Sequence, residues 1–254
     1  MRITRPAILI LSLVLAWQLL VAVTGVPHYI LPGPVPVVKA IFGNFPTLLF
    51  HLKTTLTEMV AGLFIGTFLG TGFALTMIVS PHLKRWMLPV IVISQAIPVF
   101  ALAPVLVLWI GYGMASKIAM AVLIIFFPVT ASFYDGMQRT EADLLELARI
   151  MDATPLATLR HIVIPSALPA FASGLRVATA VAPIGAVIGE WVGSSSGLGF
   201  YMLHANARMQ IDIMFAALTL LSVISLALYF SIDRFLDKLI FWETKKELTH
   251  ETPV

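Results

Sequence analysis

Long apolar runs alternate with short polar stretches along most of the chain. Six runs have the length and character of membrane-spanning helices: residues 7–23, 57–79, 87–110, 118–133, 171–192 and 214–232. A helix needs about 20 mostly apolar residues to cross the hydrocarbon core of a bilayer. The pattern therefore predicts an all-α polytopic membrane protein with six transmembrane helices.

A polar loop of residues 135–170 separates the fourth and fifth runs. It contains the segment ELARIMDATPLATLRHIVIP, residues 146–165. Thr140 and Asp143 have the spacing of a capping box with the shorter acid, and LLELARIM follows with apolar residues at helical spacing. We expect a short helix here.

The second half of the loop predicts another short helix. Asp152 and Thr154 are suited to cap it, and Pro155 suits its first turn. Pro165 and Pro169 are expected to end it before the next span. The two helices would form a hairpin around a tight turn.

The hairpin combines basic and apolar side chains. Arg149, Arg160 and His161 lie in sequence beside Leu156 and Leu159, which we expect to be exposed. Such an amphipathic hairpin can lie on the surface of a leaflet. It can also be a docking site for a partner protein, and the pattern alone leaves both alternatives open.

Composition agrees with a membrane protein and excludes a soluble one. Hydrophobic residues make up 59% of the chain and charged residues 11%, with a mean hydropathy of +0.96. Ordinary soluble domains carry about 25% charged residues. With 254 residues, the chain has room for one membrane domain but not for a large extramembrane domain.

The first run could be a signal peptide, because Arg2 and Arg5 precede its apolar core. No small-residue cleavage site follows it, only the Pro-rich segment HYILPGPVP, so we expect a retained helix. We divide the chain into this helix with an external Pro-rich segment (1–50), a transmembrane domain (51–235) and a charged cytoplasmic tail (236–254).

Basic residues choose the orientation. If the N-terminus is inside, the inner segments hold eleven of the sixteen Lys and Arg residues and the outer segments hold four, including Lys117, while Arg176 falls at an inner helix end. The positive-inside rule then places both termini and the polar loop in the cytoplasm. This topology accounts for a pI near 9.3, so we expect no nucleic-acid partner.

Several kinds of chemistry are excluded. The chain has no Cys, its six His have no paired metal-binding spacing, and no phosphate-binding GxxxxGK[ST] loop occurs. We therefore expect no catalytic residue, no metal site and no cofactor bound by this chain.

Proline and polar residues within the spans are candidates for a solute pathway. Proline inside a helix removes a backbone hydrogen bond and permits a kink, although many static membrane helices also contain it. Ser94 and Gln95 are candidate lining groups, but hydrogen bonding between helices explains them equally well. The prolines concerned are Pro89, Pro98, Pro104 and Pro183.

Two acidic residues fall within or beside apolar runs. Glu190 is a candidate gate or pathway residue; the alternatives are a partner for backbone amides in the following SSSGLG segment, or interfacial solvation. Glu58 is expected to be a first-turn acid favoured by the helix dipole. Four glycines of the second run favour close helix packing: Gly62, Gly66, Gly70 and Gly72.

The polar loop resembles a known sequence motif. It is similar to the EAA loop, about EAAxxxGxxxxxxFxxIxLP, of membrane subunits of binding-protein-dependent ABC importers. Leu147 replaces the usual second Ala and Asp152 the usual Gly, which puts the turn geometry in question. The positions that fit are Glu146, Ala148, Leu159, Ile162, Ile164 and Pro165.

The resemblance covers nearly the whole chain. The segments LPGPVPVV, SQAIPVFALAPVLVLWIGYG, FFPVTASFYDG and APIGAVIGEWVGSSSGLGF resemble the nitrate, sulfonate and taurine permease group. Within that group, IPVFALAP, APIGAVIGEW and HANARMQID look most like permeases for thiamine precursors of the hydroxymethylpyrimidine type.

The resemblance implies a MetI-like type I ABC importer permease fold, a bacterial inner-membrane location and no enzyme activity. It implies a homodimer with two ATPase chains, which use ATP and Mg, and an extracytoplasmic binding protein. It also implies that residues 152–162 form a coupling helix for the ATPase. The coupling residues would be Glu146, Ala148, Asp152, Ala153, Thr154, Leu156, Leu159, Arg160, Ile162 and Pro165. A secondary transporter and an intramembrane enzyme are the alternative classes.

Overall fold

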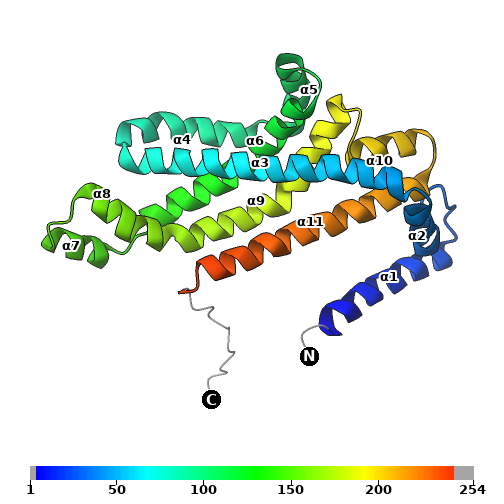
Figure 1. Cartoon of the computed structure of the whole chain (residues 1–254), viewed down its shortest axis with the longest axis horizontal. Helices are drawn as coiled ribbons and strands as arrows, with labels where there is room; N and C mark the ends of the chain where they lie inside the picture. Colours follow the sequence, from blue (N-terminus) through cyan, green and yellow to red (C-terminus); the bar gives the residue numbers. More distant parts are fainter. Residues whose placement is uncertain (1–3, 243–254) are drawn as a thin grey trace.

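The computed structural model describes residues 4–242, apart from the side chains of residues 4–7, 10 and 94–96. Helices make up nearly all of this part, and it contains no strand (Figure 1). The helices are α1 Thr4–Thr24, α2 Pro34–Gly43, α3 Phe45–Val79, α4 Pro81–Ala96, α5 Val99–Ile110, α6 Met114–Gln138, α7 Ala142–Ile150, α8 Pro155–Thr158, the π-helix η1 Leu159–Val163, α9 Ile164–Gly193, α10 Leu198–Ala207 and α11 Ile211–Leu239.

Four helical segments of the described residues are long and apolar enough to cross a membrane. They are Phe45–Val79, Met114–Gln138, Pro155–Gly193 and Ile211–Leu239. These correspond to the second, fourth, fifth and sixth predicted spans. The prediction of an all-α membrane protein is therefore confirmed.

The predicted third span is two helices rather than one. The break between α4 and α5 falls at Ile97 and Pro98, where Pro98 precedes the first residue of α5. Pro89 and Pro104 lie inside α4 and α5, which continue through them. Of the three prolines in this run, only Pro98 coincides with an interruption.

Three further features differ from the predicted elements. α3 begins at Phe45 instead of residue 57, and the short helices α2 and α10 were not foreseen. α11 continues to Leu239, and Leu236 and Ile240 are buried in the core, so the start of the predicted tail is packed helix. The rest of that tail, residues 243–254, lies outside the described residues, as does Arg2.

Short helices lie at two opposite ends of the molecule (Figure 1). The α7–α8 segment lies at one end, beside the α3–α4 connection. α2, α10 and the beginning of α11 lie at the other end. We refer to these as the α7 end and the α10 end.

Small residues bring the central helices α3, α6 and α9 together. A methyl group added at Gly62 would lie 2.5 Å from Ala121 Cβ, and one at Gly66 would lie 2.7 Å from Ile125 Cγ2. Gly70 faces Thr130 in the same way, whereas nothing lies within 4 Å of Gly72. Close packing is confirmed for the first three glycines, and it is wrong for Gly72.

The second helix of the polar loop does not end at Pro165. α8, η1 and α9 form one continuous helical segment, with helical dihedral angles at both junctions. The π-helical turn η1 interrupts the ordinary i to i−4 hydrogen bonding just before Pro165, where a missing N–H costs little. Proline is therefore accommodated inside the segment, and the expected helix end at Pro165 and Pro169 was wrong.

Candidate functional site

The polar loop forms the predicted helical hairpin at the α7 end, but Thr140 and Asp152 are not the N-caps of its two helices. Thr140 Oγ1 donates to the carbonyl of Met137 and does not cap α7, whose N-cap is Glu141. Thr154 does cap α8, because its Oγ1 accepts from the amide of Ala157, and Pro155 occupies the first turn. We call residues 142–163 the hairpin.

Asp152 forms the turn between the two helices. Its φ is 53°, in the left-handed region that normally favours glycine. The Asp152 amide donates to the carbonyl of Arg149 at 3.0 Å, and the Ala153 amide donates to that of Ala148 at 3.0 Å. This pair of bonds is a Schellman motif, which usually ends with glycine. The left-handed turn is therefore kept despite Asp.

Large apolar side chains are exposed around this turn. The exposed fractions are 83% for Ile150, 72% for Met151 and 73% for Leu156. We call these three the tip residues. Leu159, which we expected to be exposed, is half-buried, because it lies against the groove described next.

A groove of about 820 Å³ lies between the hairpin and the ends of the long helices. Leu145, Pro155 and Leu159 line it from the hairpin, and Ile78 and Met137 line it from α3 and α6. The groove places the hairpin beside the ends of two membrane helices. A force on the hairpin therefore acts next to the core of the bundle.

The other predicted coupling residues form two groups, one packed and one exposed to solvent. Ala148 is buried, and Ile162 and Pro165 are half-buried, so these three have packing roles. The remaining ones are exposed at the α7 end: Glu146, Asp152, Ala153, Thr154 and Arg160.

A second organised site lies near the α10 end, around Glu190. Glu190 is 1% exposed, and its Oε2 accepts from the backbone amides of Gly199 and Phe200, while its Oε1 accepts from Thr55 Oγ1 at 2.6 Å. The carboxylate thus caps the N-terminus of α10. Of the alternatives for Glu190, the structure shows the backbone-amide partner and excludes interfacial solvation.

Residues of α3 complete the cap on α10. The Gly197 amide donates to His51 Nδ1 at 3.0 Å, and the Leu198 amide donates to Thr55 Oγ1 at 2.8 Å. The first N–H groups of a helix lack intrahelical partners, so side chains from other elements must satisfy them when the end is buried. We call Glu190, Thr55 and His51 the α10 clamp.

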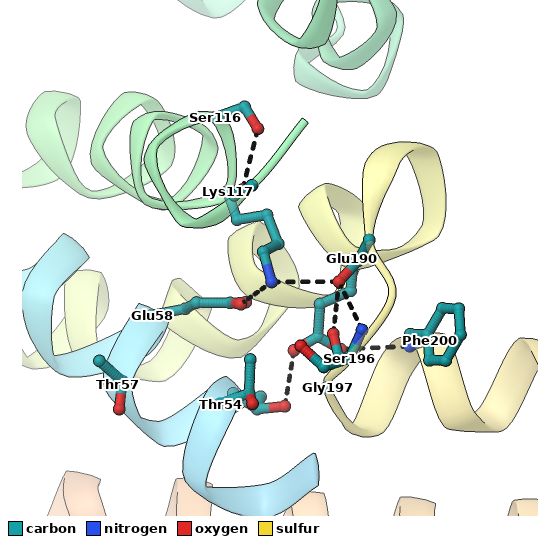
Figure 2. Close-up of polar contacts among 12 residues, drawn as sticks. Thr54, Thr57, Glu58, Ser116, Lys117, Glu190, Ser196, Gly197 and Phe200 are labelled. Atoms are coloured by element: carbon teal, nitrogen blue, oxygen red, sulfur yellow. Dashed lines mark hydrogen bonds and ion pairs between the residues drawn. The ribbon is translucent and has the colours of Figure 1, made fainter. Parts of the chain in front are cut away.

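An ion pair lies beside the clamp (Figure 2). Lys117 Nζ of α6 is 2.6 Å from Glu58 Oε1 of α3, and both side chains are almost completely buried. Lys117 Nζ also donates to Ser194 Oγ at 3.0 Å. Buried charges are tolerated when they are paired in this way.

Two predictions for these charges were wrong. Glu58 is not a first-turn acid, because α3 begins at Phe45 and buries Glu58 in its interior. Lys117 is not in an outer loop, since it lies inside α6. Hydropathy missed both because it scores each residue separately and cannot show that Glu58 and Lys117 neutralise each other. The spacing of His51, Thr55 and Glu58 on one face of α3 is the signal that could have found them.

Arg176 also differs from its predicted place. It lies within α9, and its guanidinium binds Asp233 at 2.6 Å and Asp237 at 2.8 Å on α11. It is therefore a bridge between helices rather than a helix-end residue. Pro183 lies in the unbroken interior of α9. Ser94 and Gln95 lie in α4, with side chains outside the described part of the structure.

Residues 62–241 match the family of binding-protein-dependent transport system inner membrane components. The chain belongs to this family. It is therefore a membrane permease component without catalytic activity, and among residues 4–242 no group of three His, Asp or Glu side chains is placed to hold a metal ion.

Two relatives are similar over almost the whole permease. This chain is 52% identical over 240 residues to a probable ABC transporter permease protein of Haemophilus influenzae, and the match covers 94% of this chain and 98% of the relative. It is 36% identical over 243 residues to the formylaminopyrimidine transport permease protein ThiX of Halalkalibacterium halodurans, covering 95% and 97%.

A solved structure confirms the fold of the permease. A chain of an amino acid ABC transporter superposes with a TM-score of 0.63 at 17% identity, covering 81% of this chain and 98% of that one. At this identity the likeness shows the fold alone. It agrees with the MetI-like ABC permease fold that the resemblance implied.

Proposed function

We propose that the permease forms the translocation pathway for a thiamine-precursor pyrimidine of the hydroxymethylpyrimidine type, delivered by an extracytoplasmic binding protein. The relative named as a formylaminopyrimidine permease supports this substrate class. The same architecture could instead import a sulfonate such as taurine, nitrate or a riboflavin-like solute, and these are the alternatives to test.

The proposed orientation places the α7 end in the cytoplasm and the α10 end outside. Six passes through the bacterial inner membrane follow if α1 crosses once and α4 with α5 counts as one pass. Both termini then face the cytoplasm. Because Lys117 lies in a buried ion pair, it is no longer counted among the basic residues of the outer segments. The excess of basic residues on the α7 side is therefore larger than the sequence alone indicated.

We further propose that the hairpin binds an ABC ATPase. The observation that carries this is the exposure of the three tip residues, Ile150, Met151 and Leu156, on a turn fixed by backbone hydrogen bonds. Exposed apolar side chains on a rigid support are typical of a protein interface. Two permease copies would pair with two ATPases, which hold ATP and Mg.

ATP-driven closure of the two ATPases would draw the two hairpins together. The continuous segment Pro155–Gly193 would carry that displacement from the hairpin to the α10 end. A secondary transporter would instead need a membrane-buried site for a coupling ion. Glu58 is paired with Lys117, and Glu190 accepts from Thr55 and from backbone amides of α10, which favours the ATP-driven mechanism.

The docking role is tested by co-purification of the permease with its ATPase. Leu156→Asp should abolish co-purification and uptake, since it puts a charge on the apolar contact. Met209→Asp is the matched control, because Met209 is also largely exposed, at 63% against 73% for Leu156, but lies between α10 and α11, where the substitution should leave both unchanged. Intact assembly of Leu156→Asp would refute the assignment. Leu159 is less suitable, since its half-buried side chain also packs.

The substrate is tested on the binding protein that works with this permease. Its thermal unfolding should shift upward with hydroxymethylpyrimidine and stay unchanged with taurine, nitrate and riboflavin, because a ligand stabilises the folded state that it binds. A shift with taurine alone would replace the pyrimidine by a sulfonate.

A further inference from the structure

A pocket of about 500 Å³ opens at the α10 end. The α5–α6 connection, the end of α9, the segment that follows it and α10 together form its walls. It lies at the opposite end of the molecule from the hairpin. In the proposed orientation it faces the side from which a binding protein delivers the solute.

Four side chains with aromatic rings line this outer pocket. Tyr112 and Trp191 contribute exposed rings, and Phe200 and His204 stand together on α10 with centroids 4.2 Å apart. Trp191 is held in place, because its Nε1 donates to the carbonyl of Gly199 at 3.1 Å. Rings arranged in this way offer flat faces on which a planar solute can stack.

The polar groups of the pocket favour an uncharged solute over an anion. Among its described lining residues, Lys117 has the permanent positive charge, and its Nζ is already paired with Glu58 and bonded to Ser194. Glu190 also lines the pocket and is an acidic residue. A sulfonate or nitrate would therefore find no unpaired ammonium here, whereas Ser195 and the backbone of residues 193–196 can hydrogen-bond a neutral ligand.

We propose that this outer pocket binds a flat nitrogen heterocycle with hydrogen-bonding substituents, and that it is the first binding site that the solute reaches inside the permease. The proposal rests on the proposed function and adds a place and a chemistry to it. The α10 clamp has a positioning role, since it holds the wall that carries Phe200 and His204 against α3 and α9.

The absence of cysteine provides a direct test. In the otherwise Cys-free chain, Ser195→Cys places one thiol in the pocket, in the segment that precedes α10. Asn206→Cys places one on the exposed surface of α10, outside the pocket. The intact permease–ATPase complex in proteoliposomes is treated with a maleimide, with and without hydroxymethylpyrimidine or taurine. At about ten times its dissociation constant, a bound ligand slows labelling about tenfold.

The expected result is saturable protection of Ser195→Cys by hydroxymethylpyrimidine, none by taurine, and no change at Asn206→Cys. Tyr112→Ala should raise the ligand concentration needed for half-maximal protection about tenfold, the size of one lost stacking contact, while Tyr112→Phe should leave it unchanged. Should Ser195→Cys assemble poorly, Met114→Cys is a second reporter that lines the same pocket from the start of α6.

Three outcomes overturn the proposal. They are equal protection by taurine, protection that does not respond to Tyr112→Ala, and no protection in a complex that still imports hydroxymethylpyrimidine. The last outcome removes the pocket and leaves the proposed function intact. Loss of the proposed function would appear separately, as failure of the unmodified complex to import the pyrimidine at all.

Discussion

Buried charge at Lys117 is tolerated because Glu58 neutralises it within the bundle. Neither residue marks a solute pathway by itself, since each is accounted for by the other. An apolar span can therefore contain an ion pair without losing its place in the membrane. The cost of burying these side chains in the membrane depends on the net charge of the pair rather than on the charge of either residue.

We predict that Lys117→Met destabilises the protein by about 3–5 kcal/mol, because it leaves the Glu58 carboxylate buried without its partner. The double variant Lys117→Met with Glu58→Gln should recover much of that loss. Thermal unfolding in detergent of the two single variants and the double variant measures the coupling. Additive losses would show that the pair does not interact.

Asp152 shows how one backbone angle can be kept by a different residue. A left-handed conformation costs about 1–2 kcal/mol for an ordinary L-residue and least for Gly, Asn and Asp. Asp152→Gly should therefore support normal ATPase association and uptake, whereas the β-branched Asp152→Val should reduce both.

Asp143→Val is the control for this prediction, because it introduces the same side chain at an exposed helical position of α7. It should have a much smaller effect on co-purification with the ATPase. Equal losses in both valine variants would mean that the angle at Asp152 is not important.

At the scale of the element, α10 depends on other helices for its first turn. Three side chains from α3 and α9 accept its N-terminal amides, and the approach is close enough to require glycine. A methyl group at Gly197 would lie 2.1 Å from Glu190 Cδ, at a φ of 118°. The SSSGLG segment is thus explained by the carboxylate that it surrounds.

We expect Gly197→Ala to reduce the amount of folded permease and to lower its unfolding temperature, whereas Gly72→Ala should be neutral because nothing lies near that position. Glu190→Gln should weaken the clamp by about 1–3 kcal/mol, since the amide replaces one acceptor oxygen with a donor. Fluorescence-detected gel filtration after heating compares the three. A stable Gly197→Ala would contradict the close approach.

Helix packing in the core can be tested in the same spirit. Gly62→Ala should destabilise the bundle, and Ala121→Gly should partly rescue it, because the added methyl meets Ala121 Cβ at 2.5 Å. Unfolding temperatures of the two single variants and the double variant decide this. An absence of rescue would show that α3 and α6 are further apart than described.

At the scale of the whole molecule, the two ends are specialised for different contacts. The α7 end presents the tip residues, and the α10 end contains the clamp and the outer pocket. The segment Pro155–Gly193 joins the two ends. Conformational change at one end can therefore be transmitted along a single helical path.

This arrangement predicts opposite accessibility of two single cysteines. A membrane-impermeant maleimide applied to intact spheroplasts should label Asn206→Cys at once and His82→Cys only after permeabilisation. Both positions are exposed in the structure, and His82, near the start of α4 at the α7 end, is not one of the tip residues, so a difference in labelling reports the side of the membrane. Labelling of His82→Cys in sealed cells would reverse the proposed orientation.

The sequence by itself determined the class of protein, most of its spans, the hairpin and the cap at Thr154, because hydropathy and capping are local properties. It could not place the helix end at Pro165, which depends on the π-helical turn before it. Only the tertiary structure joined Glu58 to Lys117 and decided among the alternatives for Glu190, whose carboxylate accepts from the first amides of α10. Those contacts link different helices, and no local pattern specifies which helix faces which.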